Sequence, residues 1–138
     1  MDWETCKEKR LAKEISVDTE LIKSLKISAG KKTSSAKLLE MNETTASSII
    51  TLAYDALREL LEAIAIKNGY KIYNHECYSS FLQSVMDETE MSESFDSLRK
   101  LRNSINYYGK DISIDDAKIV AEDIEELMKK CRSLLADD

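Results

Sequence analysis

The chain has 138 residues, no proline and only three glycines, so few positions interrupt a helix. Its length fits one domain, and a hydrophobic fraction of 43% is enough to build a core. A formal net charge of −6 argues against a protein that coats duplex nucleic acid through a broadly basic surface. The mixed charges favour a globular helical domain over a disordered acidic chain.

Membrane insertion and secretion are not expected from the sequence. No apolar run approaches the roughly 20 residues that a membrane-spanning helix needs, and the polar start does not resemble a signal peptide. Cys6, Cys77 and Cys131 are odd in number and far apart. We therefore expect reduced thiols, a cytoplasmic location and no membrane partner.

Helical patterns account for the first half of the chain. Residues 2–14 predict a short leading helix with a weak pattern. Asp18 is a candidate N-cap for a second helix, which the apolar spacing extends to about residue 43. A third helix over residues 44–68 is apolar over a wide arc, so we expect it at the centre, with Gly69 ending it.

The second half predicts three further helices. Asn74 can cap a short fourth helix over residues 75–86, and an acidic loop follows it. A fifth helix is predicted over residues 92–108, where Gly109 ends it. A sixth helix, with a serine N-cap and two aspartates in its first turn, spans residues 113–136.

No segment shows a pattern that predicts a strand. The connections between the long helices are short, which favours antiparallel neighbours. The sequence therefore predicts an all-α fold, namely an up-and-down antiparallel four-helix bundle with short additional helices. Residues 1–17 would form a short N-terminal helical extension and residues 18–138 the bundle.

Metal and cofactor chemistry have little support. His75 is the only histidine, and with Glu76 and Cys77 it forms the only local mixture of metal-ligand types. One histidine cannot build a typical catalytic zinc site, so we expect no metal and interpret His75 as a helix-start residue. No glycine-flanked serine, P-loop or dinucleotide fingerprint is present, and no cofactor is expected.

A polar line runs along the otherwise apolar third helix. Thr51, Asp55, Arg58 and Glu62 recur at spacings of three and four residues, so their side chains share one face. One interpretation is a solvent-facing side with an Asp55–Arg58 pair. The alternative is that this line faces Arg102 across a cleft and orients it.

The end of the fifth helix concentrates the most hydrogen-bonding groups. Candidates for a nucleotide or RNA site are Arg99, Arg102, Asn103, Asn106, Tyr107, Tyr108 and Lys110. Arg102 would bind an anion in bidentate fashion, and the tyrosines would offer stacking surfaces. The alternative is that Asn103 and Asn106 satisfy polar groups inside the bundle or at a dimer interface.

Arg102-Asn103 resembles the start of the signature of HEPN domains, small helical modules linked to nucleotide and RNA biology. That signature is an arginine, usually followed by asparagine, with a histidine four to six residues further on. Here the histidine position falls on Tyr107 or Tyr108. Residues 53–59, 68–76 and 112–117 are similar, in order and spacing, to the second bundle helix, the following link and the start of the last helix. The resemblance covers roughly residues 18–136.

The resemblance implies a homodimer that brings two arginine motifs into one cleft. Active HEPN members cut RNA without a metal, and many pair with a nucleotidyltransferase encoded beside them as toxin and antitoxin. Arg102 and Asn103 carry over to this chain, but the histidine does not. The sequence leaves open whether His75 reaches the Arg102 cleft from the fourth helix and replaces that histidine in space. A tyrosine with a pKa of about 10 is a poorer general base than a histidine with a pKa of about 6.5.

We therefore expect a HEPN-like binding and dimerisation module without catalysis. It would associate with a nucleotidyltransferase partner or bind nucleotide or RNA. One alternative is a metal-independent endoribonuclease, the toxin of such a pair, with Arg102, Asn103 and Tyr107 as candidate catalytic residues. Another alternative is a helical scaffold without a role in nucleic-acid binding.

Overall fold

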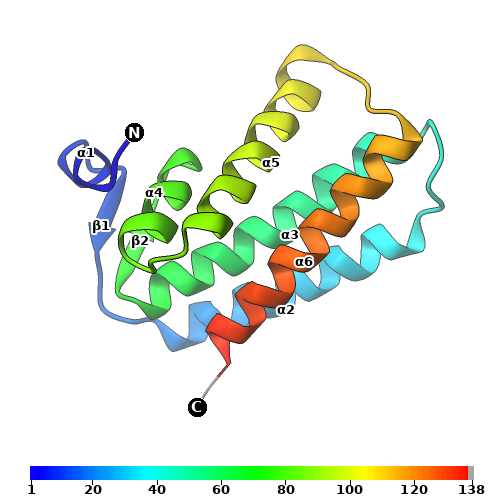
Figure 1. Cartoon of the computed structure of the whole chain (residues 1–138). Coiled ribbons are helices and arrows are strands. Elements are labelled where there is room, and N and C mark those ends of the chain that lie inside the picture. The colour runs from blue at the N-terminus through cyan, green and yellow to red at the C-terminus, as the bar shows by residue number, and fades with distance from the viewer. Residues whose placement is uncertain (137–138) are drawn as a thin grey trace.

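Residues 1–136 are described in the computed structural model, except for the side chains of Tyr107 and Tyr108. The described residues are mostly helical, which confirms the all-α class in its coarse form (Figure 1). The helices are α1 Trp3–Glu8, α2 Thr19–Leu38, α3 Ala46–Lys67, α4 Glu76–Ser84, α5 Thr89–Tyr108 and α6 Ile114–Leu135. None of the helices in this part of the chain combines the length and apolarity that crossing a bilayer requires.

Polar groups at the helix ends explain several boundaries. The side chains of Asp18 and Ser113 accept hydrogen bonds from the backbone N–H groups of Leu21 and Asp116, at 3.0 and 3.1 Å. Both predicted N-caps are thereby confirmed. Gly109 follows α5 with a φ of +62°, the left-handed conformation that glycine adopts without a steric penalty.

Other boundaries differ from the prediction. α2 ends at Leu38 rather than near residue 43, because the Asn42 side chain accepts hydrogen bonds from the backbone N–H groups of Thr44 and Thr45. These bonds hold the segment in a turn. α5 begins at Thr89, three residues earlier than predicted, and the residue before it makes no side-chain cap that the sequence could have announced.

The prediction of no strand is wrong, as is the helix predicted throughout residues 2–14. β1 Ala12–Glu14 pairs antiparallel with β2 Tyr70–Ile72, with Ala12 opposite Ile72. Arg10 adopts a φ of +58°, which ends the helical path and turns the chain into β1. Each strand has three residues, and the pairing joins distant segments, so no local period reveals it.

α3 is the central helix of the molecule. α2 and α6 lie along it, and α5 packs against α4 while also contacting α3 and α6 (Figure 1). Every residue from Ala63 to Ile66 is buried, so the wide apolar arc of α3 is covered on several sides. Glu59 of α3 is also buried and pairs with Lys32 of α2, which compensates its charge.

The expectation of reduced thiols is wrong for two of the three cysteines. Cys6 of α1 and Cys77 of α4 form a disulfide, with their Cα atoms 6.1 Å apart. Trp3 packs against Tyr70 and Phe81, and this packing brings α1 onto α4. Because the two cysteines are 71 positions apart, their pairing follows from tertiary contacts that the sequence spacing does not show.

Candidate functional site

Arg102 of α5 lies against two residues of α3. Its Nη2 atom is 3.7 Å from Oδ1 of Asp55, and its guanidinium carbon is 5.3 Å from the centre of the Tyr54 ring. Its Nε atom is buried and has no hydrogen-bond partner among the described residues. The side chain as a whole keeps 18% of its surface exposed.

His75 meets the hydroxyl end of the same tyrosine. Its Nδ1 atom lies 3.1 Å from the Tyr54 hydroxyl oxygen, and it directly precedes α4. Tyr54 therefore lies between a cation from α5 and the imidazole of the residue that precedes α4. We call Tyr54, Asp55, His75 and Arg102 the Arg102 cluster. No local signal in the sequence reveals this meeting, because Tyr54 belongs to the apolar stripe of α3 and His75 to a short connection.

The ionisation of the Arg102 cluster follows from burial and neighbouring charge. Burial lowers the pKa of His75, and the positive charges of Arg58 and Arg102 lower it further. Burial raises the pKa of Tyr54 to about 12. Near neutral pH both side chains are therefore uncharged. Either the Tyr54 hydroxyl donates to Nδ1 and the His75 proton sits on Nε2, or Nδ1–H donates and Nε2 is free to accept a proton.

The surroundings of the Arg102 cluster carry a local excess of positive charge. Five cations share three carboxylates there, although the whole chain is acidic. The ion pairs are Arg58 and Lys71 with Glu62, Arg99 and Lys100 with Asp96, and Arg102 with Asp55. A negatively charged ligand is therefore favoured at this place.

Three residues of the polar line of α3 take part in these ion pairs. Asp55 pairs with Arg102, and Arg58 donates a hydrogen bond to Glu62 at 3.1 Å rather than pairing with Asp55. The side chains of Asp55, Arg58 and Glu62 are partly buried. Thr51 is also half-buried.

The remaining candidates are spread more widely. Asn103 is half-buried on α5 and Asn106 is exposed. Lys110 lies beyond α5 and lines a separate hollow beside Ile112. The side chains of Tyr107 and Tyr108, which we predicted as stacking surfaces, lie outside the described residues.

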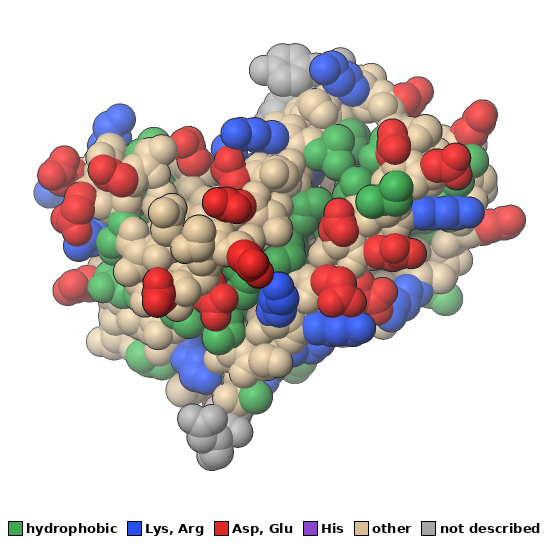
Figure 2. All heavy atoms as spheres, in the orientation of Figure 1, with side chains coloured by type: hydrophobic (Ala, Val, Ile, Leu, Met, Phe, Trp, Pro, Cys, Tyr) green, Lys and Arg blue, Asp and Glu red, His purple; other side chains and the backbone are tan. Residues whose placement is uncertain are grey.

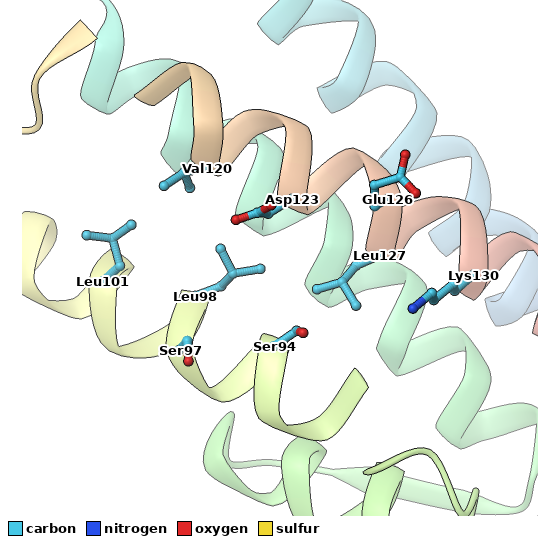
Figure 3. Close-up of a pocket in the computed structure, with 9 residues that line it drawn as sticks. All are labelled: Ser94, Ser97, Leu98, Leu101, Val120, Asp123, Glu126, Leu127 and Lys130. Atoms are coloured by element: carbon cyan, nitrogen blue, oxygen red, sulfur yellow. The ribbon is translucent and has the colours of Figure 1, made fainter. Parts of the chain in front are cut away.

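A groove of about 430 Å³ runs between α5 and α6, away from Arg102. Figure 2 shows hydrophobic side chains along this line with Asp and Glu beside them. Figure 3 shows leucine and valine side chains from both helices around the gap, with Asp123 extending toward it and Glu126 and Lys130 further along α6. We call this feature the α5–α6 groove; it is lined by Ser94, Ser97, Leu98, Leu101, Val120, Asp123, Glu126, Leu127 and Lys130.

Among the described residues, no group of three or more His, Cys, Asp or Glu side chains could hold a metal ion. Comparison of the sequence with protein-family models and with curated proteins finds no match.

Proposed function

We propose that this chain is a HEPN-like helical binding module that holds a phosphate group of a nucleotide or of RNA against Arg102. The observation that carries the proposal is the buried Nε atom of Arg102, which has no partner among the described residues. A guanidinium in this state gains hydrogen bonds when a phosphate oxygen arrives, and its planar fork matches phosphate geometry. Arg58 and Arg99 add positive potential around the same place.

The polar end of α5 would contact the rest of the ligand. In this proposal Asn103 and Asn106 bind the ribose or base, and Tyr107 and Tyr108 stack against a base. Asp55, Arg58 and Glu62 would orient the arginine rather than touch the ligand. Lys110 would contribute only long-range attraction, because it lies beside a different hollow.

We also propose an arrangement of the helices and two partners. α2, α3, α5 and α6 would form an up-and-down four-helix bundle that pairs as a homodimer with two Arg102 sites in one cleft. A small nucleotidyltransferase is the proposed protein partner, and the proposed location is the cytoplasm. Light scattering of the purified protein tests the dimer, and a monomer would remove the shared cleft. A neighbouring nucleotidyltransferase gene would support the partner.

Fluorescence anisotropy with labelled single-stranded RNA, and with a labelled adenine nucleotide, tests the phosphate site. Arg102→Ala should weaken binding by at least about tenfold, since hydrogen bonds to a charged group contribute roughly 1.5–3 kcal/mol. Arg132→Ala is the matched control, because Arg132 is exposed on α6 and the change in net charge is the same. Binding should also weaken with salt. Binding that ignores both salt and Arg102→Ala would indicate the scaffold alternative.

A metal-independent ribonuclease is the second candidate, and His75 is the observation that favours it. RNA cleavage of this kind uses the 2′-hydroxyl as nucleophile: its oxygen bonds to phosphorus while the bond to the 5′-oxygen breaks. One proton leaves the 2′-hydroxyl and one joins the departing oxygen. A histidine with an available Nε2 can move one of these protons, and Arg102 can stabilise the charge on phosphorus.

Incubation of the purified protein with transfer RNA and mixed RNA in EDTA separates the two candidates. The binding module predicts intact RNA, whereas the ribonuclease predicts cleavage that Arg102→Ala abolishes. If cleavage occurs, His75→Ala and Tyr107→Phe show which side chain moves the proton. Cleavage that persists in Arg102→Ala would come from a contaminant and would not support the ribonuclease.

A further inference from the structure

The short segment that carries His75 is fastened at both ends to the beginning of the chain. On one side Tyr73, next to β2, donates a backbone hydrogen bond to the carbonyl oxygen of Leu11 at 2.8 Å. On the other side Cys77 forms the disulfide with Cys6. His75 lies between these two attachments. Its position against Tyr54 therefore depends on the N-terminal extension, although that extension is remote in sequence.

The N-terminal extension grips α4 at several points around the disulfide. The terminal ammonium group of Met1 lies 3.1 Å from Oε1 of Glu76, the residue after His75. The hydroxyl of Ser80 donates a hydrogen bond to the carbonyl oxygen of Met1. Apart from the disulfide, these attachments are non-covalent: the contact between Met1 and Glu76 is exposed and the Ser80 hydrogen bond is partly buried. Such contacts can open locally.

The disulfide is the one covalent attachment in this set. Cys6 and Cys77 are both fully buried, so a reductant reaches them only when the packing around the disulfide opens locally. α1 has six residues and β1 has three, and elements of this size open more easily than a long packed helix. Once the disulfide is reduced, only non-covalent contacts hold the extension on α4, and the extension can separate from it.

We propose that the Cys6–Cys77 disulfide is a redox-sensitive clamp that holds His75 in hydrogen bond with Tyr54. Its thiol–disulfide state then regulates the Arg102 cluster. Cys6 and Cys77 act as positioning residues, because neither lies in the cluster itself. The effect on His75 stands on the geometry alone, whereas the effect on ligand binding rests on the proposed function.

The redox step needs a thiol reductant and a disulfide oxidant of low molecular weight. A reductant thiolate attacks one sulfur of the Cys6–Cys77 bond and forms a mixed disulfide. A second reductant thiolate then attacks the reductant sulfur of this mixed disulfide and releases the second cysteine. The products are two protein thiols and a disulfide of the reductant, after transfer of two electrons and two protons. In a reducing cytoplasm the open form is favoured, and an oxidising challenge closes the clamp.

The single histidine makes the clamp directly observable by NMR, because the imidazole of His75 gives the only histidine ring signal. The ring signal of oxidised wild-type protein is compared with that after dithiothreitol and after reoxidation with oxidised glutathione. Reduction should move the signal, and reoxidation should restore it. Cys6→Ser should match the reduced protein without reductant, and Cys131→Ser, a buried cysteine outside the disulfide, should still respond like wild type.

Three outcomes would overturn the clamp. The first is a ring signal that stays in place on reduction, since His75 would then be held without the disulfide. The second is the same shift in a Cys6→Ser sample on adding reductant. The third is loss of most helical circular dichroism on reduction, because the disulfide would then stabilise the whole fold instead of one segment.

Binding of the labelled single-stranded RNA to the same samples tests the regulatory part. Reduction should weaken it by about threefold or more, the effect of losing one hydrogen-bonding neighbour. A ring signal that moves while RNA binding stays constant would contradict regulation and leave the proposed function intact. Absence of RNA binding in both redox states, with a ring signal that still moves, would contradict the proposed function and leave the clamp intact.

Discussion

The two sides of α5 differ in chemistry although they belong to one helix. Toward α3 and α4, Arg102 lies over the Tyr54 ring, and His75 lies within hydrogen-bond distance of the Tyr54 hydroxyl. Toward α6, leucines and a valine line the α5–α6 groove together with Asp123 and Glu126. Positions three and four apart share a helix face, so a small step along α5 moves from one surface to the other.

This difference explains why net charge is a poor guide to ligand class here. The chain carries −6 overall, yet cations outnumber carboxylates around the Arg102 cluster. An anion is attracted to that side and repelled by the carboxylates of the α5–α6 groove.

The largest effect is expected from removing the packing under the Arg102 cluster. Phe95 is fully buried and stacks on Tyr54 with ring centres 5.7 Å apart. Phe95→Ala should lower the free energy of unfolding by about 3–5 kcal/mol, because it leaves a cavity. Ile119→Ala, at a residue 58% exposed on the α6 side, should change it by less than about 0.5 kcal/mol. Urea unfolding followed by circular dichroism measures the free energy of unfolding of both variants. Equal decreases would contradict the expected difference between the two sides of α5.

A subtler change tests the shape of the cation on the same side. Arg102→Lys keeps the charge but loses the planar fork and its stacking on Tyr54. Affinity for the labelled RNA should fall by roughly threefold to tenfold, less than with Arg102→Ala, as expected for a loss of about 1 kcal/mol. Anisotropy titrations at constant salt measure the difference. Equal affinity of the lysine variant and wild type would show that only charge matters there.

The pH dependence of stability follows from His75. Burial, followed by the charges of Arg58 and Arg102, lowers its pKa in the folded protein, while Asp55 opposes this shift. The unfolded chain therefore binds the proton more tightly, with a histidine pKa of about 6.5. As the pH falls below about 6.5, the free energy of unfolding should decrease until the folded-state pKa is passed. Urea unfolding of wild type and His75→Gln at several pH values in this range measures the effect. The same pH dependence of the free energy of unfolding in both proteins would contradict a contribution from His75.

The smallest effect is expected from neutralising the α5–α6 groove. Asp123→Asn with Glu126→Gln removes two carboxylates from its rim. RNA affinity should change by less than about twofold near physiological salt, because screening confines exposed charges to about 8 Å. Anisotropy with the double variant measures this change. A large gain in affinity would place the ligand across α5 and α6 instead of at Arg102.

The sequence was most informative where a local group decides the structure. Asp18 and Ser113 mark helix starts because their short side chains bond to backbone N–H groups within the next turn. Gly109 marks a helix end because its left-handed conformation is open to glycine. The helical class follows from such signals together with the apolar period.

Long-range contacts could not be predicted from the sequence, because no local pattern marks them. The strand pairing of Ala12 with Ile72 and the bond between Cys6 and Cys77 each join segments far apart in the chain. The contact between His75 and Tyr54 depends on how α4 packs against α3, and the spacing of residues along the chain does not reveal that packing. Arg102 could be singled out as a cation near a buried stripe, and Asp55 as a residue that could face it. The contacts of Tyr54 with Arg102 and His75 could not be predicted in this way.

The chain has one tryptophan, and Trp3 lies in α1, where it packs against Tyr70 and Phe81. Its fluorescence therefore reports on the docking of α1 against α4 and not on the long helices. An unfolding curve followed by this emission records detachment of the N-terminal extension, whereas circular dichroism records the helices as a whole. Separate midpoints from the two signals would mark the extension as a unit that loosens before the remainder of the fold.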